Sequence, residues 1–243
     1  MTFSTKSLVF DCDGVLLNSN LVKTQAFYRT ALPYGSGVAK DLIDYHTVNG
    51  GVSRYKKLAF FREFLLPHIT PNSLLPDLDS LLFYYAKTVR RGLLTCDVAE
   101  GLFELRELTA GIPWMIVSGS DQSELREVLS ERGLDHLFDA GIFGSPDTKD
   151  EILARELSSG NIQKPALFFG DSQYDYQAAS RAGLDFIFVT QWTEVKNWST
   201  WVKQEGITTI TSIKQLMSQA LNSGDVACLN ATFMPSTAKK PGY

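Results

Sequence analysis

The sequence predicts an α/β fold, a doubly wound, Rossmann-like parallel sheet with an inserted all-helical cap domain. Short apolar runs typical of buried strands alternate with segments of helical periodicity after residue 95, as in parallel βαβ units. Between residues 17 and 94, apolar residues recur every three to four positions without a strand pattern. We therefore expect an α/β core at 1–16 and 95–222, a helical cap at 17–94 and a C-terminal tail at 223–243.

The first predicted strand is the apolar run that begins at Leu8, and it ends in two carboxylates, Asp11 and Asp13, followed by Gly14. The backbone already turns at the carboxyl end of a strand, so both carboxylates can face one cleft. The glycine permits the turn. Two acidic groups at the mouth of a sheet are costly unless a cation or a phosphate-handling task holds them there. This cluster is therefore the first candidate site.

The predicted helical segment opens directly beside Asp13, which favours a lid over this site rather than a mere cover for the core. Ser53 is placed to cap a helix within it. Further strands are predicted at 114–117, 141–143, 166–169 and 186–189, with an edge strand at 207–210. Helices are predicted at 121–132, 148–157, 174–182 and 213–221. In such sheets, ligands bind at the carboxyl ends of the strands, near the point where the strand order reverses.

Composition narrows the class of protein. The chain has 243 residues, 44% hydrophobic and 21% charged, which suits a globular α/β domain with an insertion. The net charge of −4 argues against a nucleic-acid binder, and no apolar run approaches the length of a membrane span. Because the N-terminal residues lack the apolar core of a signal peptide, we expect a cytoplasmic protein. The three cysteines do not have the spacing of a metal site. We expect the protein to be a monomer or a homodimer.

The residue types at the strand ends suit phosphoryl transfer. A carboxylate such as Asp11 can attack phosphorus, and Asp13 could protonate the leaving oxygen and then activate water. Mg²⁺ prefers hard oxygen ligands, which suits Asp11, a backbone carbonyl and a distant carboxylate such as Asp171. Lys149 could supply a fixed cation. Ser118 and the amide of Gly119 are suitable donors for the transferring oxygens.

Four segments in order resemble the motifs of the haloacid dehalogenase-like hydrolases. They are Asp11-Cys12-Asp13-Gly14-Val15-Leu16, Ile116-Val117-Ser118-Gly119, Gly144-Ser145-Pro146 with Lys149, and Gly170-Asp171-Ser172-Gln173-Tyr174-Asp175. The resemblance implies that Asp11 is the nucleophile and Asp13 the general acid/base, with Ser118 and Lys149 on the phosphoryl group. It implies Mg²⁺ as cofactor, and its expected metal-site residues are Asp11, Asp13, Asp171 and Asp175. It also implies the α-helical cap found in phosphoglycolate phosphatases and β-phosphoglucomutases.

The acid two residues after Asp11 favours a phosphatase or phosphomutase, because relatives that cleave carbon–halogen or carbon–phosphorus bonds do not need Asp13. Gly51-Val52-Ser53-Arg54 resembles the cap motif whose arginine holds the stationary phosphate in β-phosphoglucomutases. Two departures count against a mutase: Lys23 stands where those mutases carry a histidine, and the fourth motif reads Gly170-Asp171 where they carry an acidic pair. Arg54 and Lys23 are candidate contacts to an anionic or hydroxylated substrate, although solvated helix cations are an equally good interpretation.

The expected function is therefore a Mg²⁺-dependent phosphatase that acts on a small phosphorylated metabolite, either a sugar phosphate or a phosphoglycolate-like acid. The alternatives are a phosphomutase of the β-phosphoglucomutase type and a catalytically inactive protein that binds a phosphometabolite. The intact set of four motifs speaks against the inactive protein.

Overall fold

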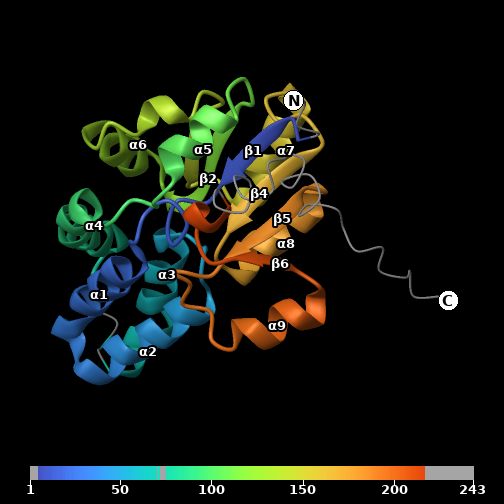
Figure 1. The fold of residues 1–243 in the computed structure, drawn as a ribbon. Helices are drawn as coiled ribbons and strands as arrows, with labels where there is room; N and C mark the ends of the chain where they lie inside the picture. The colour runs from blue at the N-terminus through green and yellow to red at the C-terminus, as the bar shows by residue number, and fades with distance from the viewer. Residues whose placement is uncertain (1–4, 70, 72–74, 217–243) are drawn as a thin grey trace.

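One six-stranded sheet organises the computed structural model, which describes residues 5–69, 71 and 75–216 (Figure 1). All paired strands are parallel, in the order β3-β2-β1-β4-β5-β6. This is the order of a doubly wound Rossmann-type sheet, as the sequence predicts. The strands are β1 (Ser7–Phe10), β2 (Trp114–Asp121), β3 (Ile142–Ser145), β4 (Ala166–Gly170), β5 (Asp185–Val189) and β6 (Thr208–Ile210).

The second strand is longer than expected, because β2 continues through Ser118 and Gly119 to Asp121. Its register against β3 shifts between Val117 and Asp121, where Asp121 pairs with Ser145. The residues expected in a loop after the strand are therefore held by the strand itself.

Both faces of the sheet are buried, and alternate residues of the central strands belong to separate clusters. Leu8 and Phe10 of β1 join one cluster and Val9 joins the other. Phe10 is fully buried, stacked on Phe169 with ring centroids 4.9 Å apart and tilted against Trp114 at 4.7 Å. Burying a phenylalanine side chain contributes about 1.5–3 kcal/mol, and each such aromatic pair about 1 kcal/mol more. The strand that ends at the candidate site is thus firmly fixed.

Helices cover the two faces, with α5 and α6 on one and α7 and α8 on the other (Figure 1). Trp198 and Trp201 of α9 pack against Phe188 of β5. These contacts indicate that the two tryptophans hold α9 against the sheet. The bounds of these helices are α5 (Leu102–Leu108), α6 (Gln122–Glu131), α7 (Lys149–Ser159), α8 (Gln173–Ala182) and α9 (Trp198–Glu205). A short 3-10 turn, η5 (Asp135–Leu137), precedes β3.

Between β1 and β2 the chain forms a helical insertion, which we define as residues 20–95. Figure 1 shows its helices gathered at the end of the sheet where β1 finishes. Within the described part of the insertion there is no strand, and Ser53 caps its third helix as predicted. Its elements are α1 (Asn20–Ala31), η1 (Leu32–Tyr34), α2 (Ser36–Val48), α3 (Arg54–Phe60), η2 (Phe61–Leu65), η3 (Leu66–His68) and α4 (Leu78–Thr95).

The chain leaves and re-enters the sheet domain side by side. Leu17 and Val98 form an isolated antiparallel bridge. Next to it, the Asn18 amide donates to the Asp97 carbonyl at 2.9 Å, and the Asn18 side chain donates to the Asp97 carboxylate at 3.2 Å. The insertion is therefore connected to the sheet by two short segments that pair with each other, residues 17–18 and 97–98, which we call the crossing pair.

The expected last helix, 213–221, begins with helical residues at 213–216, and its remainder lies outside the described residues, as does the tail at 223–243. In the part of the chain that the structure describes, every helix is too short or too polar to span a membrane.

Candidate active site

The core residues singled out from the sequence meet at one edge of the sheet. Asp11 follows β1 directly, Ser118 lies near the end of β2 and Asp171 follows β4 directly. Lys149 is the first residue of α7, and Asp175 lies in the first turn of α8. These are carboxyl ends of parallel strands and the helix starts that follow them, which explains why residues far apart in sequence converge.

Lys149 links two carboxylates at this edge. Its Nζ lies 2.9 Å from Asp11 Oδ1 and 2.5 Å from Asp175 Oδ1, and all three side chains are buried. Capping boxes fix both helix starts: Thr148 caps α7, and Ser172 and Asp175 cap α8 reciprocally. Although burial opposes its charge, Asp11 and Asp175 raise the pKa of Lys149, so the ammonium is a permanent charge here.

Three carboxylates converge beside this ammonium. Asp11, Asp171 and Asp175 each place an oxygen within 4.8 Å of the others. Burial raises the pKa of Asp11 to about 7, against the attraction of Lys149 and helped by Asp175 and Asp13. Burial, followed by repulsion from Asp11 and Asp175, raises the pKa of Asp171 well above its usual range. This excess of negative charge, carried by hard oxygen donors, suits a divalent cation such as Mg²⁺.

The two oxygens of Asp175 are already engaged, one by Lys149 and the other by the amide and hydroxyl of Ser172 at 3.0 and 2.6 Å. Asp175 therefore shares both of its carboxylate oxygens with other groups of the protein.

The chain passes very close to Asp171 at Gly14. Gly14 has a φ of +75°, and a Cβ there would lie 2.1 Å from Asp171 Oδ2. The same oxygen accepts a hydrogen bond of 2.7 Å from the Asn20 side chain, which also donates to the Trp192 carbonyl at 2.9 Å. A glycine is therefore required at position 14 for both conformation and space.

Ser118 is fully buried, and its Oγ accepts a hydrogen bond of 3.1 Å from the Ser120 amide. Gly119 lines the cavity beside it. A Cβ on Gly119 would lie 2.0 Å from the Gly51 carbonyl oxygen, so the insertion touches the end of β2 here.

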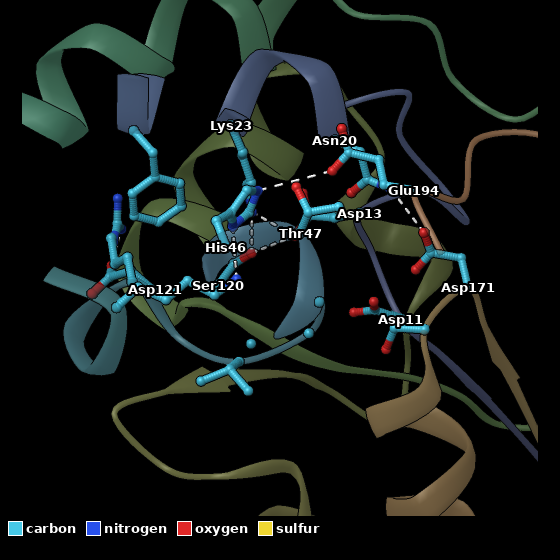
Figure 2. Close-up of a pocket in the computed structure, with 18 of the residues that line it drawn as sticks. Asp11, Asp13, Asn20, Lys23, His46, Thr47, Ser120, Asp121, Asp171 and Glu194 are labelled. Atoms are coloured by element: carbon cyan, nitrogen blue, oxygen red, sulfur yellow. Dashed lines mark hydrogen bonds and ion pairs between the residues drawn. The ribbon is translucent and has the colours of Figure 1, made fainter. Parts of the chain in front are cut away.

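Asp13 is tied to the insertion by an ion pair with Lys23 of α1 at 2.5 Å. Figure 2 shows this pair beside Ser120, whose hydroxyl donates to Asp13 at 2.6 Å, and the Ser19 hydroxyl donates at 2.5 Å. Although burial opposes ionisation, the Lys23 charge and these hydrogen bonds lower the pKa of Asp13 to about 2. Asp13 is thus a carboxylate at neutral pH, and Lys23 is not a solvated helix cation.

Arg54 lies at the cavity as expected, but its guanidinium is occupied by carboxylates of the sheet domain. Its Nη1 lies 2.9 Å from Glu124 and its Nη2 lies 3.6 Å from Asp121. The Tyr85 ring lies under the guanidinium, 5.4 Å from centroid to Cζ. Arg54 therefore joins the insertion to the start of α6.

Sequence reasoning did not identify a second polar group in the cavity, formed by Lys57, His46, Thr24 and Glu194. Lys57 Nζ lies 2.8 Å from His46 Nδ1, and His46 Nε2 lies 3.1 Å from Thr24 Oγ1. Thr24 donates in turn to Glu194 at 3.1 Å. Lys57 follows Arg54 by three residues on α3, which places both on one helix face. This spacing is the sequence feature that could have pointed to Lys57. No spacing in the sequence points to His46 or Glu194.

Most of these groups line one cavity of about 70 Å³ between the sheet edge and the insertion, whereas Ser118, Lys149 and Asp175 lie behind its lining. Figure 2 shows Asp11 and Asp171 on one side of it and His46 and Lys23 on the other. Its acidic and basic lining residues, apart from the neutral His46, are Asp11, Asp13, Lys23, Arg54, Lys57, Asp121, Glu124, Asp171 and Glu194.

Comparison with known proteins gives a family and a fold. A family model described as haloacid dehalogenase-like hydrolase matches residues 5–183. A predicted phosphoglycolate phosphatase from Haemophilus somnus is 17% identical, with a TM-score of 0.69 over 90% of this chain and 99% of that one. A predicted phosphatase from Clostridium acetobutylicum is 19% identical, with a TM-score of 0.67 over 90% and 100%.

A proposed β-phosphoglucomutase from Thermotoga maritima is 18% identical, with a TM-score of 0.62 over 90% of this chain and 99% of that one. At these identities the solved structures establish the fold alone. No curated protein matches the sequence.

Proposed function

Because the chain belongs to the haloacid dehalogenase-like hydrolase family, we propose that it is a Mg²⁺-dependent phosphatase that hydrolyses a small phosphorylated metabolite through an aspartyl-phosphate on Asp11. The observation that supports this most directly is the setting of Asp11. It is a buried carboxylate at the end of the central strand, held by Lys149 and next to Asp171. A nucleophile, a fixed cation and a candidate metal ligand thus share one edge of the sheet.

The hydrogen bonds to Asp11 support a choice between its two oxygens. Within the described residues, both donors to its side chain, Lys149 at 2.9 Å and the Cys12 amide at 2.8 Å, contact Oδ1. Oδ2 is therefore the oxygen that attacks phosphorus, as the bond from phosphorus to the leaving oxygen breaks. Water then attacks the aspartyl-phosphate, which releases inorganic phosphate and regenerates Asp11.

Asp13 would give a proton to the leaving oxygen in the first step and take one from water in the second. Its ion pair with Lys23 favours the carboxylate, which is ready to act as the base. To act as the acid, Asp13 has to gain a proton, so we propose that the pair with Lys23 opens when substrate enters.

Asp11 and Asp171 would hold the Mg²⁺, with a backbone carbonyl at Asp13 as a further ligand and Asp175 in support. The metal would offset the charge of the phosphoryl group and of the carboxylates that face it. Lys149 would hold a phosphoryl oxygen, and Ser118 with the Gly119 amide would donate to the others.

We propose that the helical insertion acts as a cap, with the domain boundaries set near residues 17 and 94. It supplies Lys23, Arg54 and Lys57 to the cavity and contacts the end of β2 at Gly119. A cap in this position would exclude bulk water from the aspartyl-phosphate.

Phosphate release in the presence of Mg²⁺ tests the proposal, across a panel of sugar phosphates, phosphoglycolate and nucleotides. We expect a few substrates to be hydrolysed by the wild type and by Asp41→Asn, a control on the exposed face of α2. Asp11→Asn should lose that activity while keeping its fold by circular dichroism. Full activity of Asp11→Asn would refute the mechanism.

A phosphomutase is the second candidate, because Gly51, Val52 and Arg54 of the mutase-like motif line the cavity. The pairing of Arg54 with Glu124 counts against it, since a guanidinium held by a carboxylate is less available to a second phosphate. Phosphorus NMR of glucose 1-phosphate incubated with the enzyme and Mg²⁺ separates migration of the phosphate from its release.

A further inference from the structure

Three cationic side chains of the helical insertion, Lys23, Arg54 and Lys57, line the cavity. Two of them are neutralised locally: Lys23 by Asp13 at 2.5 Å and Arg54 by Glu124 at 2.9 Å. Lys57 differs from both. Among the described residues, no carboxylate oxygen lies within the ion-pair distance of 4.0 Å from its Nζ.

The groups in direct contact with Lys57 are apolar or neutral, while the Lys23, Asp13 and Glu194 charges act on it from beyond ion-pair distance. Its side chain is 2% exposed, the Phe27 ring lies 5.6 Å from Nζ, and its hydrogen-bond partner is His46 Nδ1 at 2.8 Å. An ammonium has three donors, so two remain for a ligand. A buried cation without a counter-ion is unfavourable unless a ligand supplies one.

The contacts of His46 show which way these hydrogen bonds run. Burial lowers the pKa of His46 to about 2, with Lys57 and Lys23 acting in the same direction, so the imidazole is neutral. His46 Nδ1 can then accept from Lys57 while Nε2 donates to Thr24 Oγ1, and Thr24 donates to Glu194. In this series of hydrogen bonds, Lys57, His46 and Thr24 each donate to the next group, and the series ends at Glu194. It fixes Nζ in the cavity without neutralising it.

Lys57 is also separate from the proposed reaction centre. It forms no ion pair with Asp11 or Asp171, and Lys149 already faces Asp11 from the sheet side. Figure 2 shows His46, which holds Lys57, on the opposite side of Asp13 from Asp11.

From this geometry we propose that Lys57 and His46 form a subsite for a second anionic group of the substrate, at the end remote from the phosphoryl group. The inference rests on the proposed phosphatase function and narrows its substrate class to phosphoric monoesters that carry a carboxylate or a second phosphate. Lys57 is then a residue that determines specificity, and His46 positions it.

Matched substrates with and without the second anion test the subsite. One pair is phosphoglycolate and 2-hydroxyethyl phosphate, for the carboxylate, and the other is glucose 1,6-bisphosphate and glucose 1-phosphate, for the second phosphate. The proteins are the wild type, Lys57→Met and Lys40→Met, which removes an equal charge from an exposed site on α2. The readouts are kcat and KM for each compound.

We expect Lys57→Met to raise KM for the doubly anionic member of one pair by about 10–100-fold, as for other charge-assisted hydrogen bonds. KM for the singly anionic member and all kcat values should change less than about threefold, and Lys40→Met should resemble the wild type. The pair that responds identifies the anion. An equal loss on both members, or no loss on either, would overturn the subsite.

If no compound is hydrolysed, the proposed function fails but the subsite remains testable by calorimetric binding of the same four compounds. Binding of a doubly anionic member that is weakened by Lys57→Met supports the subsite. Absence of any binding that depends on Lys57 overturns it.

Discussion

The buried ammonium of Lys57 lowers the stability of the folded protein, and in the proposed subsite the same ammonium binds an anion. Burial lowers its pKa to about 7, and the nearby Lys23 charge lowers it further, whereas Asp13 and Glu194 oppose the shift. The unfolded chain keeps this proton up to its ordinary pKa near 10.5. Between these values the unfolded state binds more protons, so stability rises with pH. Lys57 therefore reduces the free energy of unfolding by its full amount below pH 7, and this reduction disappears as the pH approaches 10.5.

We predict that Lys57→Met makes the protein more stable at pH 6, by about 1–2 kcal/mol, because an apolar side chain replaces a buried charge. This gain exceeds the loss of the hydrogen bond to His46, and it should be clearly smaller at pH 9, on its way to zero near pH 10.5. Urea unfolding at both pH values measures the difference. A variant that is less stable than the wild type at pH 6 would contradict the assignment of Lys57 as an uncompensated charge.

At the scale of elements, the approach of the insertion to β2 depends on the absence of a side chain at Gly119. The Gly51 carbonyl occupies the space that a Cβ would need, 2.0 Å away. Gly119 does not have a left-handed backbone, so an alanine there conflicts with the neighbouring loop rather than with its own conformation.

We therefore predict that Gly119→Ala displaces the loop at Gly51 and lowers kcat/KM by about 10–100-fold, as small misplacements in active sites do. Gly160 is a suitable control, because it ends α7 with a φ of +80° and has no neighbour within 4 Å of a built Cβ. Gly160→Ala should lower the free energy of unfolding, measured with urea, by about 1 kcal/mol and leave kcat/KM unchanged. Equal activity of the two variants would show that the loop contact has no bearing on turnover.

The ion pair of Arg54 with Glu124 joins α3 to α6. Its side chains are 8% and 12% exposed, so removal of one partner leaves a largely buried charge. We predict that Arg54→Met lowers the free energy of unfolding by about 3 kcal/mol, as for other buried pairs broken on one side.

The double variant Arg54→Met/Glu124→Leu should recover most of that loss, because both charges are gone. Arg90→Met is the matched control, since Arg90 forms exposed pairs with Glu127 and Glu131. That change should cost less than about 1 kcal/mol. Urea unfolding of the set would disprove the assignment if Arg54→Met and Arg90→Met were equivalent.

The elements that the sequence predicts well are those whose signals are local. β1 contains the apolar run Leu8–Phe10 directly before Asp11, and the starts of α7 and α8 carry their own caps at Thr148 and Ser172. The sheet edge then brings Asp11, Lys149 and Asp171 together, because parallel strands share it.

The cavity wall is not predictable in the same way. The motif makes Arg54 a candidate substrate contact, but its partner Glu124 lies 70 residues away and becomes a neighbour only in the folded chain. Likewise, Glu194 meets Thr24 across 170 residues. A motif identifies such a side chain, whereas tertiary contacts decide whether its charge is free.

At the scale of the whole molecule, the stability should depend on Mg²⁺ and on pH together. The pKa values of Asp11 and Asp171 are raised above the unfolded value of 3.8. Between about pH 4 and 7 these two carboxyls therefore bind more protons in the folded state, and without metal their contribution to stability falls as the pH rises. A divalent cation bound to these carboxylates would reverse that loss.

We predict that Mg²⁺ at about 100 times its Kd stabilises the protein by about 2.7 kcal/mol, which corresponds to a Tm increase of about 5–10 °C at pH 8. The increase should be smaller at pH 5, where the carboxyls hold protons, and EDTA should abolish it. Asp171→Asn should largely remove the response. Differential scanning calorimetry measures these shifts, and a response that is the same at both pH values would contradict binding at the carboxylates.

The crossing pair at Asn18 and Asp97 has a consequence for how this chain can be altered. Strands bridged in this way keep their Cα atoms about 5 Å apart. A foreign segment whose ends lie equally close could therefore replace residues 19–96 and keep the strand ends in place, provided that it supplies new partners for Asp13 and Asp171 in place of Ser19, Asn20 and Lys23. On the proposed role of the insertion as a cap, a graft at this one junction would change the substrate while the sheet edge keeps Asp11, Lys149 and Asp171.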